Sequence, residues 1–220
     1  MSKFYAVKTG KNPGIYTSWT ECEKNVKGFS GAIYKSFTNR KEAEAFLSQN
    51  VSPLNFDNMI GVFTDGSHSK HEENGYKGFG AFCSYRGKEY LFSGNCDDMI
   101  LEKYGIDPKA KISNPTLEFL AFAELLSMIY ETKKDFKKYT FLFKIDYDGV
   151  RNWMNNSWSA KELYIKKIKN QCEFYIRHIT AQIQIEHVPG HAGVYGNEKA
   201  DQLSKSHIAI NTFPELFSIL

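Results

Sequence analysis

The sequence predicts an α/β protein in two parts: a small α+β unit, then a mixed five-stranded sheet flanked by helices. The first observation is the alternation of apolar strand segments with helical segments beyond residue 58. The second is TFLFKID, which is apolar almost throughout, as in a parallel strand buried on both faces. The third is a ββαβα order within the first 47 residues, whose aromatic residues can supply a separate core.

The N-terminal unit reads as three short strands and two helices. FYAVKTG and IYT predict the first two strands, and AIYKSF predicts the third. Ser18 to Glu21 match a capping box that begins a helix over residues 19–26, and Asn39 caps a second helix over 40–48.

The second unit begins with MIGVFTDGS, a strand that we expect to end in a glycine turn. GFGAFCSYRGKEYLFSGNC predicts an antiparallel pair with its turn at residues 86–88. Residues 95–112 look irregular or weakly helical. A helix should begin at Asn114, with Pro115 in its first turn, and run to about Tyr130.

Four more elements are expected after TFLFKID. GVRNWMNN predicts a short helix, and a capping box at Ser159 predicts a long helix that continues to about His178. QIQIEHV predicts a strand, and EKADQLSKSHI predicts the final helix. The expected domains are residues 1–47 and 59–210, with a polar linker at 48–58 and a tail at 211–220.

Composition bounds the class of protein. With 220 residues, of which 42% are hydrophobic, the chain has a globular composition, and it contains no apolar run of the roughly 18 residues that a membrane helix needs. MSKFYAVKTG lacks the features of a signal or transit peptide, so we expect a cytoplasmic protein. We also expect it to be a monomer. The four cysteines form no CxxC pair, which favours free thiols and disfavours a zinc site.

Charge is divided unevenly along the chain. The net charge is +3, but residues 1–50 carry eight Lys and Arg against four Asp and Glu. If the protein binds a polyanion, the N-terminal unit is the expected contact; an ordinary solvated surface is the alternative.

Four acidic residues stand in apolar segments: Asp65, Glu118, Asp146 and Asp201. Carboxylates that converge in a partly buried place repel one another unless a proton or a cation intervenes. Oxygen ligands of this kind suit Mg²⁺, with Mn²⁺ as a substitute, and such sites cleave phosphodiesters. Taken singly, each acid has a structural alternative, such as turn chemistry at Asp65 or a helix first-turn acid at Asp201.

Together FTDGS, PTLEFLAFAEL, FKIDYDG and HVPGHAGVYGNEKADQLSK resemble ribonuclease H of type 1, in the order found in that family. FYAVKTG, GIYTSWTEC and AIYKSF resemble the hybrid-binding domain at the N-terminus of many such enzymes. The resemblance implies an endonuclease that cuts the RNA strand of RNA–DNA hybrids and leaves 5′-phosphate and 3′-hydroxyl ends.

The resemblance also assigns roles residue by residue. It implies that the four acids hold two Mg²⁺ ions and that His191, in a loop, assists proton transfer or product release. Asn197 and Glu198 would lie beside the last ligand. The expected hybrid contacts are Tyr5, Trp19, Tyr34, Lys35, Gly66, Ser67, Asn114 and Trp153, although Trp153 can equally be a core residue.

Three departures from the family pattern stand out. Ser36 replaces a second lysine in the hybrid-binding domain, and Tyr147 and Asp148 follow Asp146 in place of the usual residues. The segment after Trp153 is short and only modestly basic, so the N-terminal unit is expected to take over the grip on the hybrid.

Two other classes remain open. A transposase or integrase domain shares the fold and the acids but lacks the HVPGHAG…GNEKAD signature. A non-catalytic hybrid-binding protein would not need all four acids.

Overall fold

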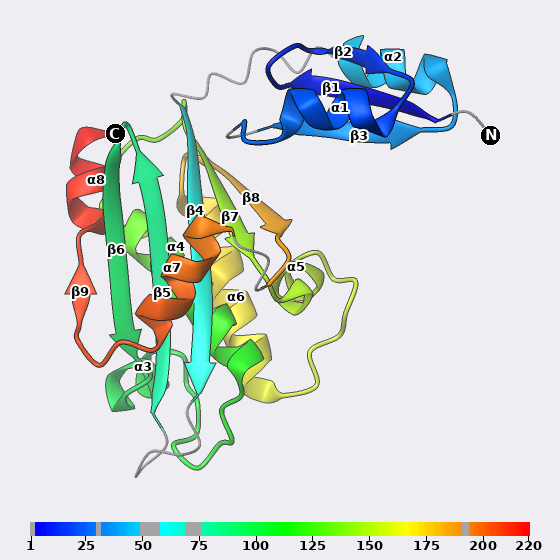
Figure 1. Ribbon diagram of the computed structural model, residues 1–220. Helices are drawn as coiled ribbons and strands as arrows, with labels where there is room; N and C mark the ends of the chain where they lie inside the picture. Colours follow the sequence, from blue (N-terminus) through cyan, green and yellow to red (C-terminus); the bar gives the residue numbers. More distant parts are fainter. Residues whose placement is uncertain (1–2, 30–31, 49–57, 69–75, 191–193) are drawn as a thin grey trace. The chain divides into compact units, whose positions relative to one another are not determined.

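The computed structural model describes residues 3–29, 32–48, 58–68, 76–190 and 194–220, and the chain forms two compact units divided near residue 55 (Figure 1). The predicted linker lies almost wholly outside the described residues. Of the helices described, none combines the length and the apolar character needed to cross a bilayer.

The N-terminal unit is a three-stranded antiparallel sheet with two helices, as the sequence predicts. Its elements are β1 (Phe4–Thr9), β2 (Gly14–Tyr16), α1 (Trp19–Val26), β3 (Ile33–Phe37) and α2 (Arg40–Ser48). The strand order is β2-β1-β3. Ser18 is the N-cap of α1 as expected, because the Glu21 amide donates to Ser18 Oγ at 3.3 Å.

The second unit contains a six-stranded mixed sheet of order β8-β7-β4-β5-β6-β9. Its strands are β4 (Met59–His68), β5 (Lys77–Tyr85), β6 (Lys88–Asn95), β7 (Thr140–Ile145), β8 (Gln182–His187) and β9 (Ile210–Asn211). The pairs β4–β7 and β7–β8 are parallel, and the others are antiparallel. The five predicted strands are confirmed, and β9 adds a short sixth.

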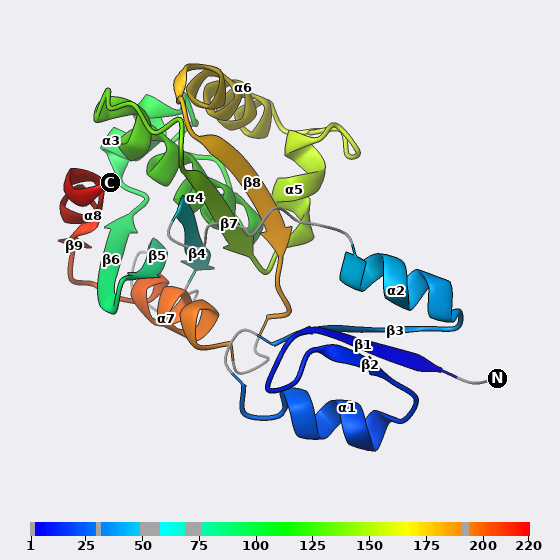
Figure 2. The same cartoon turned by 90° about the horizontal axis from the view of Figure 1, so that it is seen from above.

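The described part of this unit also contains six helices: α3 (Asp98–Lys103), α4 (Asn114–Glu131), α5 (Asp148–Met154), α6 (Leu163–His178), α7 (Tyr195–Ser204) and α8 (Phe213–Ile219). Figures 1 and 2 show α4 and α6 on one face of the sheet and α7 on the other. Because α4 has a sheet on one side and helices on the other, 13 of its 18 residues are buried.

Several expectations differ from the structure in detail. β4 runs through Gly66 to His68 as a paired strand, so the expected glycine turn there is wrong. The tight turn between β5 and β6 contains two residues, Arg86 and Gly87, both with positive φ. β7 is buried on one face and half-buried on the other. The half-buried face is less covered because the helix on that side of the sheet, α7, packs on β4 and β5.

Two further differences concern helices. The capping box at Ser159 does not form: α6 begins at Leu163, and its N-cap residue Glu162 makes no side-chain capping bond. The region expected to be a tail contains α8, whose Phe213, Leu216 and Phe217 are buried in the core, so EKADQLSKSHI is not the final helix.

The segment between β6 and α4 is also more ordered than the sequence suggests. It contains α3, and Leu101, Tyr104, Ile106 and Ile112 are buried in the main core. The Tyr104 hydroxyl donates to the buried Glu124 carboxylate at 2.7 Å, which ties this segment to α4.

Candidate active site

Asp65 and Asp146 lie side by side because their strands are parallel neighbours. The register of β4 and β7 pairs Thr64 with Ile145. Asp65 directly follows Thr64, and Asp146 directly follows Ile145. Parallel strands in register bring equivalent residues to the same level of the sheet. Two carboxyl groups separated by 81 positions in the sequence therefore meet at one edge.

Glu118 reaches the same place from α4. A Cβ atom at Gly66 would lie only 2.2 Å from the Glu118 amide nitrogen, so α4 can approach β4 this closely only because residue 66 has no side chain. Gly66 thus sets the distance between the helix and the strand. The alternative that Asp65 and Gly66 serve a turn is wrong, since both are paired with β5.

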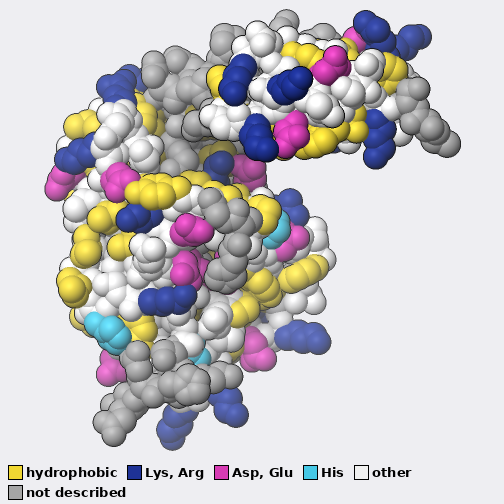
Figure 3. Space-filling model, in the orientation of Figure 1, with side chains coloured by type: hydrophobic (Ala, Val, Ile, Leu, Met, Phe, Trp, Pro, Cys, Tyr) yellow, Lys and Arg dark blue, Asp and Glu magenta, His cyan; other side chains and the backbone are white. Residues whose placement is uncertain are grey.

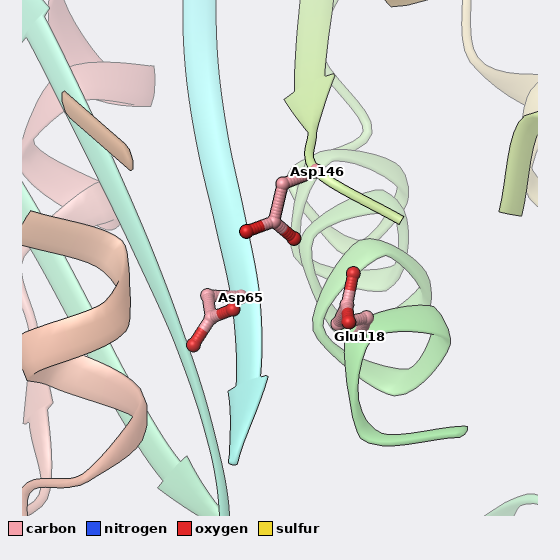
Figure 4. Close-up of side chains that lie close together, drawn as sticks. All are labelled: Asp65, Glu118 and Asp146. Carbon is pink, nitrogen blue, oxygen red and sulfur yellow. The ribbon is translucent and has the colours of Figure 1, made fainter. Parts of the chain in front are cut away.

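The three carboxylates form one group. One oxygen from each of Asp65, Glu118 and Asp146 lies within 4.8 Å of the others, and Figure 4 shows the three side chains pointing toward one another. Asp65 and Glu118 are each only 7% exposed. Acidic side chains also lie close together on the face of this unit seen in Figure 3.

Burial and mutual repulsion disfavour the charged forms of these acids. Burial, followed by the charges of Asp146 and Asp65, raises the pKa of Glu118 to about 9. Burial also raises the pKa of Asp65 to about 6, against a hydrogen bond from Ser204 that lowers it. The site therefore favours a proton or a cation among its oxygens.

The donor set fits a hard divalent cation. The ligand atoms are carboxylate oxygens, the kind that Mg²⁺ and Mn²⁺ prefer. Glu118 Oε2 is buried and accepts no hydrogen bond from the described residues, which leaves its lone pairs available. A buried carboxylate oxygen without a donor is costly, and a bound cation would remove that cost.

The structure places Asp201 beside this group and outside it. Asp201 lies on α7, near enough to Asp65 for its charge to raise the Asp65 pKa. Its Oδ1 accepts from Lys205 Nζ at 2.5 Å, one helical turn further along. Among the described residues, the acids with oxygens within 4.8 Å of one another are Asp65, Glu118 and Asp146.

Further predicted residues surround the acids. Asn197 is buried and donates to Asp146 Oδ2 at 3.2 Å. Glu198 is exposed in the first turn of α7, and Asn114 is exposed at the start of α4. His191 lies outside the described residues, so its predicted role stays a prediction.

Trp153 is half-buried and packs as a core residue would. Its ring lies 5.4 Å from Phe119 and 5.7 Å from Tyr147, measured between centroids. Asp148, the extra acid of the departing motif, forms an ion pair with Arg151 at 2.7 Å in the same helix. The packing favours the core alternative for Trp153 and gives Asp148 a local helical partner.

In the N-terminal unit the three predicted aromatic residues form a continuous row. The Trp19 ring lies 5.8 Å from Tyr5 and 5.8 Å from Tyr34, and both Trp19 and Tyr34 are 44% exposed. Lys35 is exposed, but it follows Tyr34 directly in β3 and therefore points to the other face of the sheet. Its Nζ lies 5.7 Å from the Phe37 ring centroid. Figure 3 shows Lys and Arg side chains spread over the visible face of this unit.

Sequence analysis did not identify Ser204 and Lys205. Ser204 Oγ donates to Asp65 Oδ2 at 2.6 Å across 139 positions of sequence. A serine near the end of a helix carries no signal of such a contact. Only the packing of α7 against the sheet reveals it.

Two family models match the sequence of this chain. Residues 57–209 match the model described as RNase H, and residues 3–47 match one described as the ribonuclease H1 N-terminal domain. The first match covers well over half of the chain. The chain belongs to the ribonuclease H family and has the N-terminal domain of ribonuclease H1.

Individual relatives agree with this assignment. The chain is 24% identical to human ribonuclease H1 over 92% of its own length and 88% of that protein. It is 45% identical to the ribonuclease H of Saccharomyces cerevisiae over 53 residues, which are 24% of this chain and 15% of the yeast protein. The match to the Crithidia fasciculata enzyme likewise spans only 9% of that relative, at 53% identity over 20% of this chain.

A solved structure of similar fold is LC11-RNase H1, isolated from compost by a metagenomic approach. It superimposes with a TM-score of 0.50 at 16% identity, over 66% of this chain and 92% of that one. This likeness supports the fold of the second unit.

Proposed function

We propose that this protein is an endonuclease that hydrolyses the RNA strand of RNA–DNA hybrids. The observation that carries the proposal is the group of three carboxylates within 4.8 Å of one another, two of them buried, in a chain that belongs to the ribonuclease H family. Relatives matched along most of this chain are named ribonuclease H1.

Asp65, Glu118 and Asp146 would hold a divalent cation, for which we propose Mg²⁺ with Mn²⁺ as a substitute. Asp201, adjacent to Asp65, would serve a second ion. Such ions activate a water molecule and stabilise the leaving 3′ oxygen, so that the products carry 5′-phosphate and 3′-hydroxyl ends. The protein supplies the fixed oxygens and excludes water from the buried side of Asp65 and Glu118.

The N-terminal unit would bind the hybrid through its aromatic row. The exposed rings of Trp19 and Tyr34 can pack on deoxyribose or on a base, contacts that do not depend on sequence. A tethered binding unit raises the effective concentration of hybrid at the catalytic unit. Lys35 would contact phosphate along the edge of the sheet.

Discrimination of RNA from DNA depends on contacts to the 2′-hydroxyl group. Asn114, exposed at the start of α4, and the backbone at Gly66 and Ser67 are our candidates for those contacts, and His191 is our candidate for proton transfer. Glu198 would assist beside Asp201. A cytoplasmic location and a monomeric state are proposals from the sequence alone.

One assay tests the proposal. A labelled RNA–DNA hybrid, duplex DNA and duplex RNA are each incubated with the protein and Mg²⁺, with Asp65→Asn as the control. We expect cleavage of the RNA strand of the hybrid alone, and none with the variant. Cleavage of duplex DNA would indicate an integrase-type nuclease, and binding of the hybrid without cleavage would indicate a non-catalytic protein.

A further inference from the structure

Helix α7 presents two neutral hydrogen-bond donors to the two strand carboxylates. Asn197 Nδ2 donates to Asp146 Oδ2 at 3.2 Å, and Ser204 Oγ donates to Asp65 Oδ2 at 2.6 Å. These donors are seven residues apart, about two helical turns, so they share one face of α7. Asp65 lies in β4 and Asp146 directly follows β7, so α7 contacts one carboxylate at each of these two parallel strands.

The position of Ser204 is fixed by close packing against β5. Gly80 is the cross-strand partner of Asp65, and a Cβ atom there would lie 2.5 Å from the Ser204 amide nitrogen. Ser204 is fully buried as a result. Ser93 Oγ also donates to the Leu203 carbonyl oxygen at 2.9 Å, which anchors this end of α7 to β6.

The Ser204 hydroxyl has one hydrogen and two acceptors within reach. Asp65 Oδ2 lies at 2.6 Å and the main-chain oxygen of Asp201 at 2.8 Å. A hydroxyl bonded only to a carbonyl three residues earlier is common at helix ends and has no functional meaning. The shorter contact to Asp65 is different, because it reaches a carboxylate of the grouped acids from another element.

We propose that Ser204 is a positioning residue of the metal site: it holds Asp65 Oδ2 so that the carboxylate faces Glu118 and Asp146 before any cation binds. Asn197 acts in the same way on Asp146. Helix α7 thus holds the carboxylates of Asp65 and Asp146 in position through two hydrogen bonds, and it also carries Asp201. The inference rests on the metal-dependent nuclease proposed above.

Loss of either of these two hydrogen bonds should lower the affinity for the metal ion. Donors that orient a metal-binding carboxylate restrict its rotation, and their loss commonly weakens metal binding by about 10- to 100-fold. Ser204→Ala should therefore weaken binding of Mg²⁺ or Mn²⁺ to the full-length, substrate-free chain by about tenfold or more. Cleavage by the variant should recover at high Mg²⁺ concentration, because the ligands themselves remain.

The experiment is calorimetric titration of Mg²⁺ and of Mn²⁺ into the wild-type chain and variants. Ser206→Ala is the matched control, since the Ser206 hydroxyl contacts the backbone at Ile208 and no acid. We expect wild-type affinity for this control. Ser204→Cys keeps a side-chain donor at this position, although a weaker one on a larger atom, so it should bind with intermediate affinity even if the alanine variant fails to fold.

The outcomes separate the two proposals. Wild-type affinity in Ser204→Ala and Ser204→Cys, even with lowered thermal stability, would overturn the role of Ser204 and leave the nuclease proposal intact. A wild-type chain that binds neither ion would overturn the metal site and this inference with it.

Discussion

The two units of this protein place their functional residues in opposite environments. In the N-terminal unit, Trp19 and Tyr34 are exposed over a core of a few residues, chiefly Val7, Cys22 and Val26. In the second unit, Asp65 and Glu118 are buried against a large core. Apolar rings on a surface cost little folding free energy, whereas buried carboxylates cost several kcal/mol on the order-of-magnitude scale for desolvated charges.

The large core of the second unit accounts for this difference. A small domain has little stability to spare and cannot hold unpaired charges in place. Binding through exposed rings makes no such demand.

Replacing Asp65 by Asn should reduce hybrid cleavage by roughly a thousandfold or more, as loss of one member of a catalytic set commonly does. Hybrid binding should persist through the N-terminal unit. Because the variant removes a carboxylate whose burial raises its pKa, the metal-free protein should also melt at a higher temperature. Cleavage rates, hybrid titration and thermal melting check the three parts. A variant with normal cleavage would contradict the assignment of the site.

The stability of the metal-free second unit should fall as pH rises. The pKa of Glu118 is about 9 in the folded chain, against an ordinary value of 4.5. Between these values the unfolded chain is ionised at this carboxyl and the folded chain holds the proton, so unfolding releases a proton. The stabilisation is complete below about pH 4.5 and is lost through pH 9.

Urea unfolding in EDTA should show this fall, on the order of a few kcal/mol. Glu118→Gln, which cannot ionise, should flatten the curve, and Mg²⁺ should stabilise the wild type most at high pH. Equal slopes for the wild type and the variant would show that Glu118 does not hold a proton in the folded chain.

Trp19→Ala should raise KM for a long hybrid by about tenfold, because loss of one aromatic stacking contact typically costs 1–3 kcal/mol. The turnover number should stay near the wild-type value, since the acids are untouched. Phe29→Ala is the control: Phe29 is also exposed in this unit but is not part of the aromatic row. A fall in turnover with unchanged KM would contradict the division of roles.

We expect the smallest effect at Ser18 and Ser159, which begin the two segments that match a capping-box pattern. Ser18→Ala should destabilise the N-terminal unit by about 1 kcal/mol, the usual value of a helix N-cap, because Ser18 accepts the Glu21 amide hydrogen. Ser159→Ala should change stability by less than about 0.5 kcal/mol, as an ordinary surface substitution does. Urea midpoints of both variants measure this difference.

The contrast between Ser18 and Ser159 illustrates what local sequence can predict. Both segments match one pattern, and only one of them begins a helix at the expected residue. Likewise α8 was expected to be a tail, because seven residues with three large apolar side chains have no long period to reveal a helix. Its packing against the core decides its structure.

The order of the two units, most of the elements and the identity of the acids follow from local patterns and from motifs in a fixed order. Which of the acids meet depends instead on how segments remote in the sequence pack together. The parallel register brings Asp146 to Asp65, a missing Cβ at Gly66 admits Glu118, and Lys205 engages Asp201. The contact between Ser204 and Asp65 likewise depends on how α7 packs on the sheet. Distances between remote segments are set by packing and not by local sequence.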